Sequence, residues 1–346
     1  MQKFRNFAQM SVTENFDIAG LFTSDKTDFR ARAISLFNFQ YLHNPFYNRY
    51  CDLIHCIPEN VSNIIDIPFL PIGFFKNKDI TSTIFEPELI FESSKTTGSV
   101  ASRHLVKDAA LYEQSYLQSF QRFYGDVKKY CIIGLLPSYL ERNNSSLVYM
   151  VNDLIRRSEN EHSGFYLNDF KSLWNILKQN EEKRQTTLLF GVTFALLDFA
   201  SEYPLPLRYT TVIETGGMKG RKKEMTREEV HAKLQTDFAT SSIHSEYGMT
   251  ELLSQAYATD KGIFTCPPWM KMLIRDSDDP FTIKSVDELA KSQSGLGNII
   301  DLANVYSCAF LATDDVVKLH PDETFEILGR SDNSDIRGCS LMVNAV

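Results

Sequence analysis

The sequence lacks several features that would assign it to a specialised class of protein. Its 346 residues include six cysteines, and no two of them form the Cys-x-x-Cys pair of a zinc or redox motif. No apolar run approaches the about 18 residues that a membrane-spanning helix needs, and the first residues show no apolar signal region. We therefore expect a cytoplasmic protein without a transmembrane segment, in which the cysteines are reduced.

An excess of basic charge is also missing. The chain carries 36 Lys and Arg residues against 44 Asp and Glu residues, so its formal net charge is −8. Proteins that bind nucleic acids need a basic face to neutralise phosphates, and this balance argues against a nucleic-acid partner. No His, Cys or Asp spacing resembles a zinc site. The sequence contains no internal repeat and no Pro/Ser-rich linker that would mark a clean domain boundary.

The N-terminal part is rich in aromatic residues at helical spacing. Phe29, Ala33, Phe37 and Tyr41 fall on one face of a helix, which predicts a helical segment within residues 1–62. The apolar run that follows, from residue 64, does not have this helical spacing. We expect this helical segment to precede the main domain.

Strand-like and helix-like runs alternate from about residue 88, which is typical of βαβ units and favours an α/β fold with a largely parallel sheet. His104 and His231 are predicted to lie on helices. The last hundred residues predict short strands instead, over 262–265, 270–274, 305–311 and 325–328. The earlier predicted strands are 88–91, 130–136, 187–192 and 209–213, and the predicted helices are 194–199 and those capped by Asp108, by Asn144 or Ser145, and by Thr226.

Polar residues gather at four places after predicted strands, where ligands bind in open α/β sheets. The first is a Ser/Thr loop in which the hydroxyls and backbone of Ser93, Ser94, Thr96, Thr97 and Gly98 are able to grip a polyphosphate. A solvated turn is the structural alternative for this loop.

The second place is the turn over residues 214–217. Here Gly216 and Gly217 allow backbone carbonyls to approach a flat ring closely. The turn becomes informative only together with the other three places.

The third place is the sequence Tyr-Gly-Met-Thr-Glu over residues 247–251. Tyr247 offers a stacking face, Thr250 a phosphate contact, and Glu251 a carboxylate for Mg²⁺, an ion that prefers oxygen ligands and phosphates. In the fourth place, Asp315 is suited to accept two ribose hydroxyls and Arg330 to pair with a phosphate. The alternatives are a helix N-terminus at Glu251 and a surface ion pair at Asp315 and Arg330.

The order of these four places resembles that of the adenylate-forming superfamily, which includes acyl-CoA synthetases, peptide-synthetase adenylation domains and luciferase. Within it the chain resembles the LuxE-type acyl-protein synthetases over residues of about 60 to 340. The superfamily's phosphate loop matches residues 93–98, and its Tyr-Gly-x-Thr-Glu motif matches Tyr247, Gly248, Thr250 and Glu251. Its ribose aspartate and its Gly-Arg motif match Asp315 and the pair Gly329 and Arg330.

The resemblance implies the layered α/β fold of the superfamily's large N-terminal domain, here over residues 63–335, with ATP and Mg²⁺ as cofactors. Two departures stand out. Lys95 takes the place of a usual glycine, and the chain stops soon after Arg330, so we expect the usual full C-terminal domain to be lacking.

A LuxE-type protein is implied to join a fatty acid to AMP and then to transfer the acyl group to a cysteine near its own C-terminus, for use by an acyl reductase partner. The candidate is Cys339, in a tail over 336–346, where Arg337 favours the thiolate. Cys308 and Cys266 are weaker candidates, and a small buried hydrophobe is the structural alternative for Cys339.

Two other functions stay open at this point. One is an acyl- or aryl-CoA ligase that uses free coenzyme A in place of a protein thiol. The other is a non-catalytic subunit that binds a nucleotide and serves as a scaffold for a reductase. Lys95 is compatible with the scaffold, whereas the complete motif at residues 247–251 argues against it.

Overall fold

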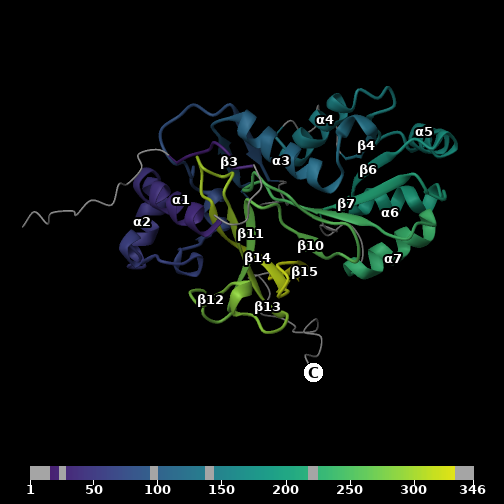
Figure 1. Cartoon of the computed structure of the whole chain (residues 1–346). Helices are drawn as coiled ribbons and strands as arrows, with labels where there is room; N and C mark the ends of the chain where they lie inside the picture. The colour runs from purple at the N-terminus through teal and green to yellow at the C-terminus, as the bar shows by residue number, and fades with distance from the viewer. Residues whose placement is uncertain (1–15, 23–28, 94–99, 137–143, 217–224, 332–346) are drawn as a thin grey trace, which may run out of the picture.

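A large mixed sheet runs through the protein in the computed structural model, which describes residues 16–22, 29–93, 100–136, 144–216 and 225–331. The sheet has 13 strands in the order β12-β11-β13-β14-β15-β10-β9-β8-β7-β6-β4-β5, with β1 paired to β14. Helices α1 and α2 lie at one side of the molecule and α4 to α7 at the other (Figure 1). The predicted α/β fold with layered sheets and helices is confirmed.

One half of the sheet is parallel. Its strands are β4 (Cys131–Leu135), β5 (Gly164–Phe165), β6 (Thr187–Val192), β7 (Thr210–Thr215) and β8 (His244–Tyr247), and all neighbours among them pair in parallel. Every residue of β4 is buried. A strand buried on both faces reads as a continuous apolar run, which is why this half was visible in the sequence.

Helices cross between these parallel strands. They are α4 (Ser146–Ser158), α5 (Phe170–Lys183), α6 (Thr193–Glu202) and α7 (Arg227–Phe238), and α3 (Ala109–Phe123) precedes β4. Asp108 and Ser145 accept backbone N–H groups at the starts of α3 and α4, and Thr226 and Glu229 form the predicted capping box of α7. His231 lies on α7 as predicted, whereas α5 was not predicted.

The other half of the sheet is antiparallel, so the prediction of a largely parallel sheet is wrong there. Its strands are joined by connections too short for a crossover, such as the five residues 320–324. Its strands are β9 (Ala256–Ala258), β10 (Phe264–Thr265), β11 (Met270–Arg275), β12 (Ile283–Lys284), β13 (Gln293–Asp301), β14 (Phe310–Leu319) and β15 (Phe325–Arg330).

Two further sequence predictions need correction. The predicted strand over 305–311 begins only at Phe310, because the preceding residues form a buried turn in which Ser307 donates to the Ile80 carbonyl. His104 lies on a strand and not on a helix. It belongs to β3 (Arg103–Val106), which pairs only with β2 (Leu89–Glu92) in a small separate sheet.

The N-terminal helices pack into the main core. Phe37 of α1 (Phe29–His43) and Tyr47 of α2 (Pro45–Leu53) contact Phe310 of β14, close to β1 (Leu70–Pro71). Gln40 is fully buried; its amide nitrogen donates to the carbonyls of residues 304 and 305, and its oxygen accepts from the N–H of residue 309. These helices and the sheet therefore share one core.

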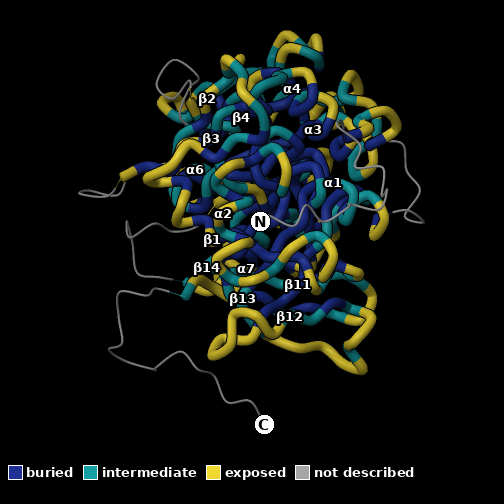
Figure 2. Tube along the Cα trace, turned by 90° about the vertical axis from the view of Figure 1, so that its left-hand side faces the viewer, coloured by how far each residue is buried: buried dark blue, intermediate teal, exposed yellow. Residues whose placement is uncertain are grey.

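Two apolar clusters lie on opposite faces of the parallel strands. Ile132 and Leu188 belong to the larger cluster with α3 and α4, and Ile133 and Leu189 belong to the smaller one with α5, α6 and α7. Buried segments run through the middle of the molecule, and exposed ones lie at its rim (Figure 2). Among the described residues, every helix is too short or too polar to span a lipid bilayer.

Candidate active site

Three predicted site residues meet where the two halves of the sheet join. The hydroxyl of Tyr247, at the end of β8, donates to Asp315 Oδ2 on β14 at 2.7 Å. Asp315 lies opposite Arg330 in the β14–β15 pairing, with Arg330 Nε 3.5 Å from Asp315 Oδ1. The Tyr247 ring packs edge-on against Phe264 and Phe325. The third and fourth polar places of the sequence therefore form one site.

Burial shapes the charges of this group. It raises the pKa of Asp315 above its usual value, while the hydrogen bond from Tyr247 and the charge of Arg330 act in the opposite direction. Tyr247 is buried and has its pKa raised well above the usual value, so it stays a neutral hydrogen-bond donor. Arg330 keeps much of its side chain in solvent. The site thus presents a buried carboxylate beside an exposed cation.

Glu251 lies next to the base of the Ser/Thr loop. Glu251 is 5% exposed, and its carboxyl group lies near enough to the Ser102 side chain for Ser102 to lower its pKa. Ser102 is paired in turn with Ser93, through Ser93 N to Ser102 O at 3.0 Å and Ser102 N to Ser93 Oγ at 2.9 Å. The first and third polar places of the sequence therefore adjoin.

Opposing effects act on Glu251. Burial raises its pKa, and the positive charges of Arg330 and of Lys76, the last residue of a short 3₁₀ helix, lower it. Two positive charges thus act on a buried carboxyl group at the edge of the Ser/Thr loop. A cation bound beside this carboxyl group would stabilise its charged form. The basic side chains can in turn hold a neighbouring anion.

Six predicted site residues lie outside the described residues. They are Ser94, Thr96, Thr97, Gly98, Gly217 and Cys339. Their positions relative to Glu251 stay predictions.

The second polar place begins at the end of β7. Gly216 has a φ of 77°, which favours glycine, and its carbonyl oxygen lies 3.4 Å from Thr193 Oγ1. The same hydroxyl donates to the buried carboxyl group of Glu214, whose other oxygen lies 4.0 Å from Arg227 Nε. Thr193 begins α6, so it ties this turn to the neighbouring strand and helix.

Glu246 is a site residue that the sequence interpretation missed. Its carboxyl group is buried beside Tyr247, and Thr215 Oγ1 donates to it at 2.5 Å. Burial raises its pKa to about 7; the hydrogen bond from Thr215 opposes this shift and the charge of Glu214 adds to it. A charged residue inside an otherwise buried strand was the only signal available in the sequence.

The predicted Gly248 is explained by this carboxyl group. A Cβ atom at residue 248 would lie 2.5 Å from Glu246 Oε1, closer than the two atoms can approach. Because Thr215 holds the other carboxylate oxygen, Glu246 cannot swing away without losing that bond. Glycine at 248 is therefore required by its neighbour.

Asp301 is a second missed residue, and it supports the segment after Glu251. Its carboxylate accepts from the backbone N–H groups of Leu253 at 2.8 Å and Ser254 at 3.1 Å, and from Ser254 Oγ at 2.6 Å. Burial raises its pKa to about 6, and these hydrogen bonds oppose the shift. No local motif marks such a distant support in the sequence.

The two weaker thiol candidates are poorly suited to attack. Cys266 and Cys308 both have a pKa raised to about 12 by burial, which leaves little thiolate at neutral pH. The described residues contain no group of three or more His, Cys, Asp or Glu side chains arranged to hold a metal ion.

Comparisons with known proteins identify the family. No curated protein matches the chain. The family model of LuxE, the acyl-protein synthetase, matches residues 21–346. The chain belongs to the LuxE acyl-protein synthetase family. The resemblance found in the sequence is therefore confirmed.

Solved structures of other proteins share the fold of this LuxE-family chain. ATP-bound MatB from Rhodopseudomonas palustris is 16% identical, with a TM-score of 0.53 over 72% of this chain and 50% of MatB. A luciferase-like enzyme from the nonluminescent mealworm Zophobas morio is 14% identical, with a TM-score of 0.50 over 77% of this chain and 62% of that one. At such identities the likeness concerns the fold alone, and the LuxE-family chain spans about half the length of MatB.

Proposed function

We propose that this LuxE-family protein uses ATP to activate a carboxylic acid and passes the acyl group to a cysteine thiol. Membership of the family suggests that the acid is a fatty acid. The observation that supports this most directly is the contact of Glu251 with Ser102, which joins the motif at 247–251 to the base of the Ser/Thr loop. Tyr247 of the same motif donates a hydrogen bond to Asp315, and Asp315 forms an ion pair with Arg330.

The first step asks little acid or base chemistry of the protein. A carboxylate oxygen of the substrate attacks the α-phosphorus of ATP, a bond to phosphorus forms, and the bond to the β-phosphate breaks, releasing pyrophosphate. The protein's task is to align the two reactants and to offset negative charge. We assign the offset of negative charge to Arg330 and the binding of the ribose hydroxyls to Asp315.

Glu251 is the residue that we assign to Mg²⁺. The ion prefers oxygen ligands and commonly binds one or two carboxylates together with substrate phosphates, which suits a single buried carboxylate next to a phosphate loop. When bound, Mg²⁺ would offset the charge of the phosphates. The Ser102 side chain, which is near the Glu251 carboxylate and lowers its pKa, would help to orient it.

In the second step a thiol sulfur attacks the acyl carbon, the bond between that carbon and the AMP oxygen breaks, and the thiol proton passes to solvent. We assign this sulfur to Cys339. It follows Arg330 by nine residues, a length that reaches at most about 30 Å when fully extended. An acyl reductase is then the partner that takes the acyl group, as the family's resemblance implied.

The test mixes the protein with ATP, Mg²⁺ and a panel of fatty and aromatic acids, and measures pyrophosphate release and the intact mass of the protein. The variants are Cys339→Ser and, as a matched control, Cys56→Ser, which removes a partly exposed thiol that hydrogen-bonds the Asp66 carbonyl. We expect pyrophosphate release in all three proteins and an acyl adduct in the wild type and Cys56→Ser alone.

Other outcomes would favour the alternatives. An adduct on Cys339→Ser would place the acceptor thiol elsewhere. Turnover that requires coenzyme A and leaves the protein mass unchanged would indicate a coenzyme A ligase. If none of the acids in the panel leads to pyrophosphate release, that result would favour a nucleotide-binding scaffold.

A further inference from the structure

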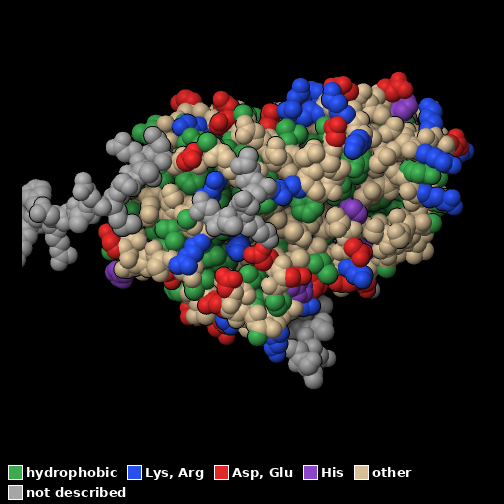
Figure 3. All heavy atoms as spheres, in the orientation of Figure 1, with side chains coloured by type: hydrophobic (Ala, Val, Ile, Leu, Met, Phe, Trp, Pro, Cys, Tyr) green, Lys and Arg blue, Asp and Glu red, His purple; other side chains and the backbone are tan. Residues whose placement is uncertain are grey.

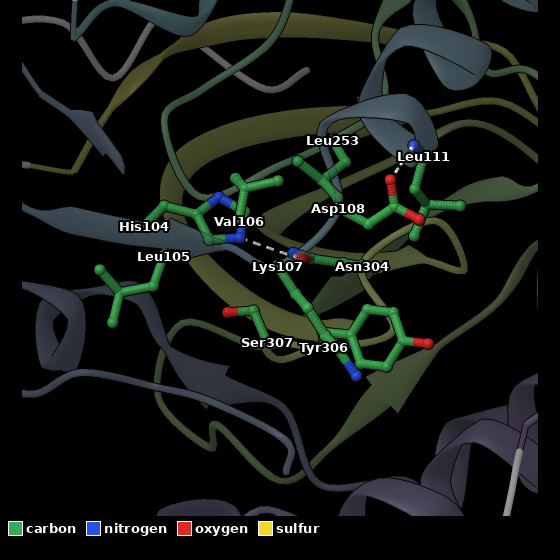
Figure 4. A pocket seen from close by; sticks show the side chains of 10 residues that line it. All are labelled: His104, Leu105, Val106, Lys107, Asp108, Leu111, Leu253, Asn304, Tyr306 and Ser307. Atoms are coloured by element: carbon green, nitrogen blue, oxygen red, sulfur yellow. Dashed lines mark hydrogen bonds between the residues drawn. The ribbon is translucent and has the colours of Figure 1, made fainter. Parts of the chain in front are cut away.

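His104 connects the two sides of the candidate site. Its ring is 1% exposed, with Nδ1 2.8 Å from the Thr250 carbonyl oxygen and Nε2 3.1 Å from Asn304 Oδ1. Figure 4 shows the ring pointing toward Asn304 from β3. Strand β3 follows the Ser/Thr loop directly, and Thr250 precedes Glu251. The ring therefore bridges two segments that are 146 residues apart.

Asn304 has a fixed orientation. Its amide nitrogen donates to the Glu251 carbonyl at 2.7 Å and to the Cys308 carbonyl at 3.0 Å. Both of these partners only accept, so the amide oxygen is the atom that faces His104. The backbone carbonyl of Asn304 is in turn bound by Gln40.

Glu251 is consequently held from both sides. The carbonyl before it, of Thr250, faces His104, and its own carbonyl is bound by Asn304. Its side chain contacts Ser102, two residues before His104. The side chains of His104 and Asn304 thus hold the backbone on the two sides of Glu251, and neither takes part in the reaction itself.

The role of His104 depends on which of its two ring nitrogens carries the proton. Burial lowers the pKa of His104 to about 4, so the ring is neutral near pH 7 and carries one N–H, although both nitrogens face acceptors. The Nδ1 contact is the shorter of the two, which favours the proton on Nδ1. In that form the ring donates to Thr250, and its Nε2 carries no proton.

We propose that His104 is a positioning residue for the adenylation step, acting by donating its Nδ1 proton to the Thr250 carbonyl. This bond keeps the Glu251 carboxylate against Ser102 at the edge of the Ser/Thr loop. The proposal rests on the proposed function, since positioning has a catalytic effect only if Glu251 acts in adenylation. A displacement of about 1 Å is enough to cost about 100-fold in rate.

Two amide variants separate the two nitrogens. The side-chain nitrogen of His104→Asn lies near the place of Nδ1, and that of His104→Gln near the place of Nε2. Both replace the ring by a small neutral amide, so each is the other's matched control for lost packing. We expect His104→Asn to keep kcat for pyrophosphate exchange within about threefold of the wild type, and His104→Gln and His104→Ala to lose about 10- to 100-fold with KM for ATP little changed.

Equal losses in the Asn and Gln variants, or a loss that follows their thermal unfolding midpoints, would reduce His104 to a packing residue and overturn the proposal. A second measurement is independent of activity. Nitrogen NMR of the ¹⁵N-histidine-labelled wild type, with the His104 signals identified by their absence in His104→Gln, should show the proton on Nδ1. A proton on Nε2 would overturn the proposal even in an active enzyme. An inactive wild type with the proton on Nδ1 would instead contradict the proposed function.

Discussion

Replacement of Glu246 by glutamine should change the pH dependence of stability in a way that is set by one buried carboxyl group. Burial raises the pKa of Glu246 from 4.5 to about 7 in the folded protein. At about 1.4 kcal/mol for each pH unit, this difference corresponds to roughly 3 kcal/mol of unfolding free energy. Glu246 is 8% exposed, so solvent screens little of it.

The sign follows from proton binding. Between about pH 4.5 and 7 the unfolded chain has lost the proton of Glu246 while the folded protein still holds it. Stability therefore falls as pH rises through this range and levels off above it. Glutamine never ionises, and its carbonyl oxygen can still accept the hydrogen bond from Thr215.

The assay is urea unfolding of the wild type and Glu246→Gln at pH 5, 6, 7 and 8. Because the other titrating groups are common to both proteins, we expect the free-energy difference to shift in favour of the variant by roughly 2.5 kcal/mol between pH 5 and 8, since the rest of the effect lies below pH 5. Glu86→Gln, at an exposed carboxyl group, is the control and should show no such shift. A free-energy difference that is independent of pH would refute the assignment of a raised pKa to Glu246.

Three other substitutions test the site. Glu251→Gln should slow pyrophosphate exchange by at least about 100-fold, and an unchanged rate would remove Glu251 from the site. Tyr247→Phe should lower the unfolding free energy by about 1 to 2 kcal/mol, because buried Asp315 loses its donor; an unchanged urea midpoint would contradict that hydrogen bond. Asp301→Asn should cost about 2 to 4 kcal/mol, since the amide nitrogen would face either the N–H groups of Leu253 and Ser254 or, in the other orientation, the N–H of Ala303, and calorimetry showing a loss below about 1 kcal/mol would argue against this role.

The parallel half of the fold was predictable because its signals are local. The capping box of Thr226 and Glu229 and the cap at Asp108 act within three residues, and the buried run over 187–192 is continuous. Strand β13 has no such signal. It contains Gly295, Gly297 and Asn298, which are unfavourable in strands, and it forms because β11 and β14 pair with it on both sides.

The site residues also fall into those that a sequence motif reveals and those that it does not. Tyr247 and Asp315 were recognisable from motifs, although their contact joins residues 68 positions apart. Ser102, Glu246 and Asp301 belong to no motif, and only the folded chain brings them to the site. His104 was placed on a helix from its surroundings, since a four-residue strand in a two-stranded sheet leaves almost no periodicity to read.

The buried amide of Gln40 has a consequence for synthesis of the protein on the ribosome. Its partners lie 264 to 269 residues further along the chain. At about 5 to 20 residues per second, a nascent chain waits about 15 to 50 s after making Gln40 before the last of these partners exists. Helix α1, which carries Gln40, is thus among the last of the described elements to be completed, and its apolar face lacks these partners in the meantime.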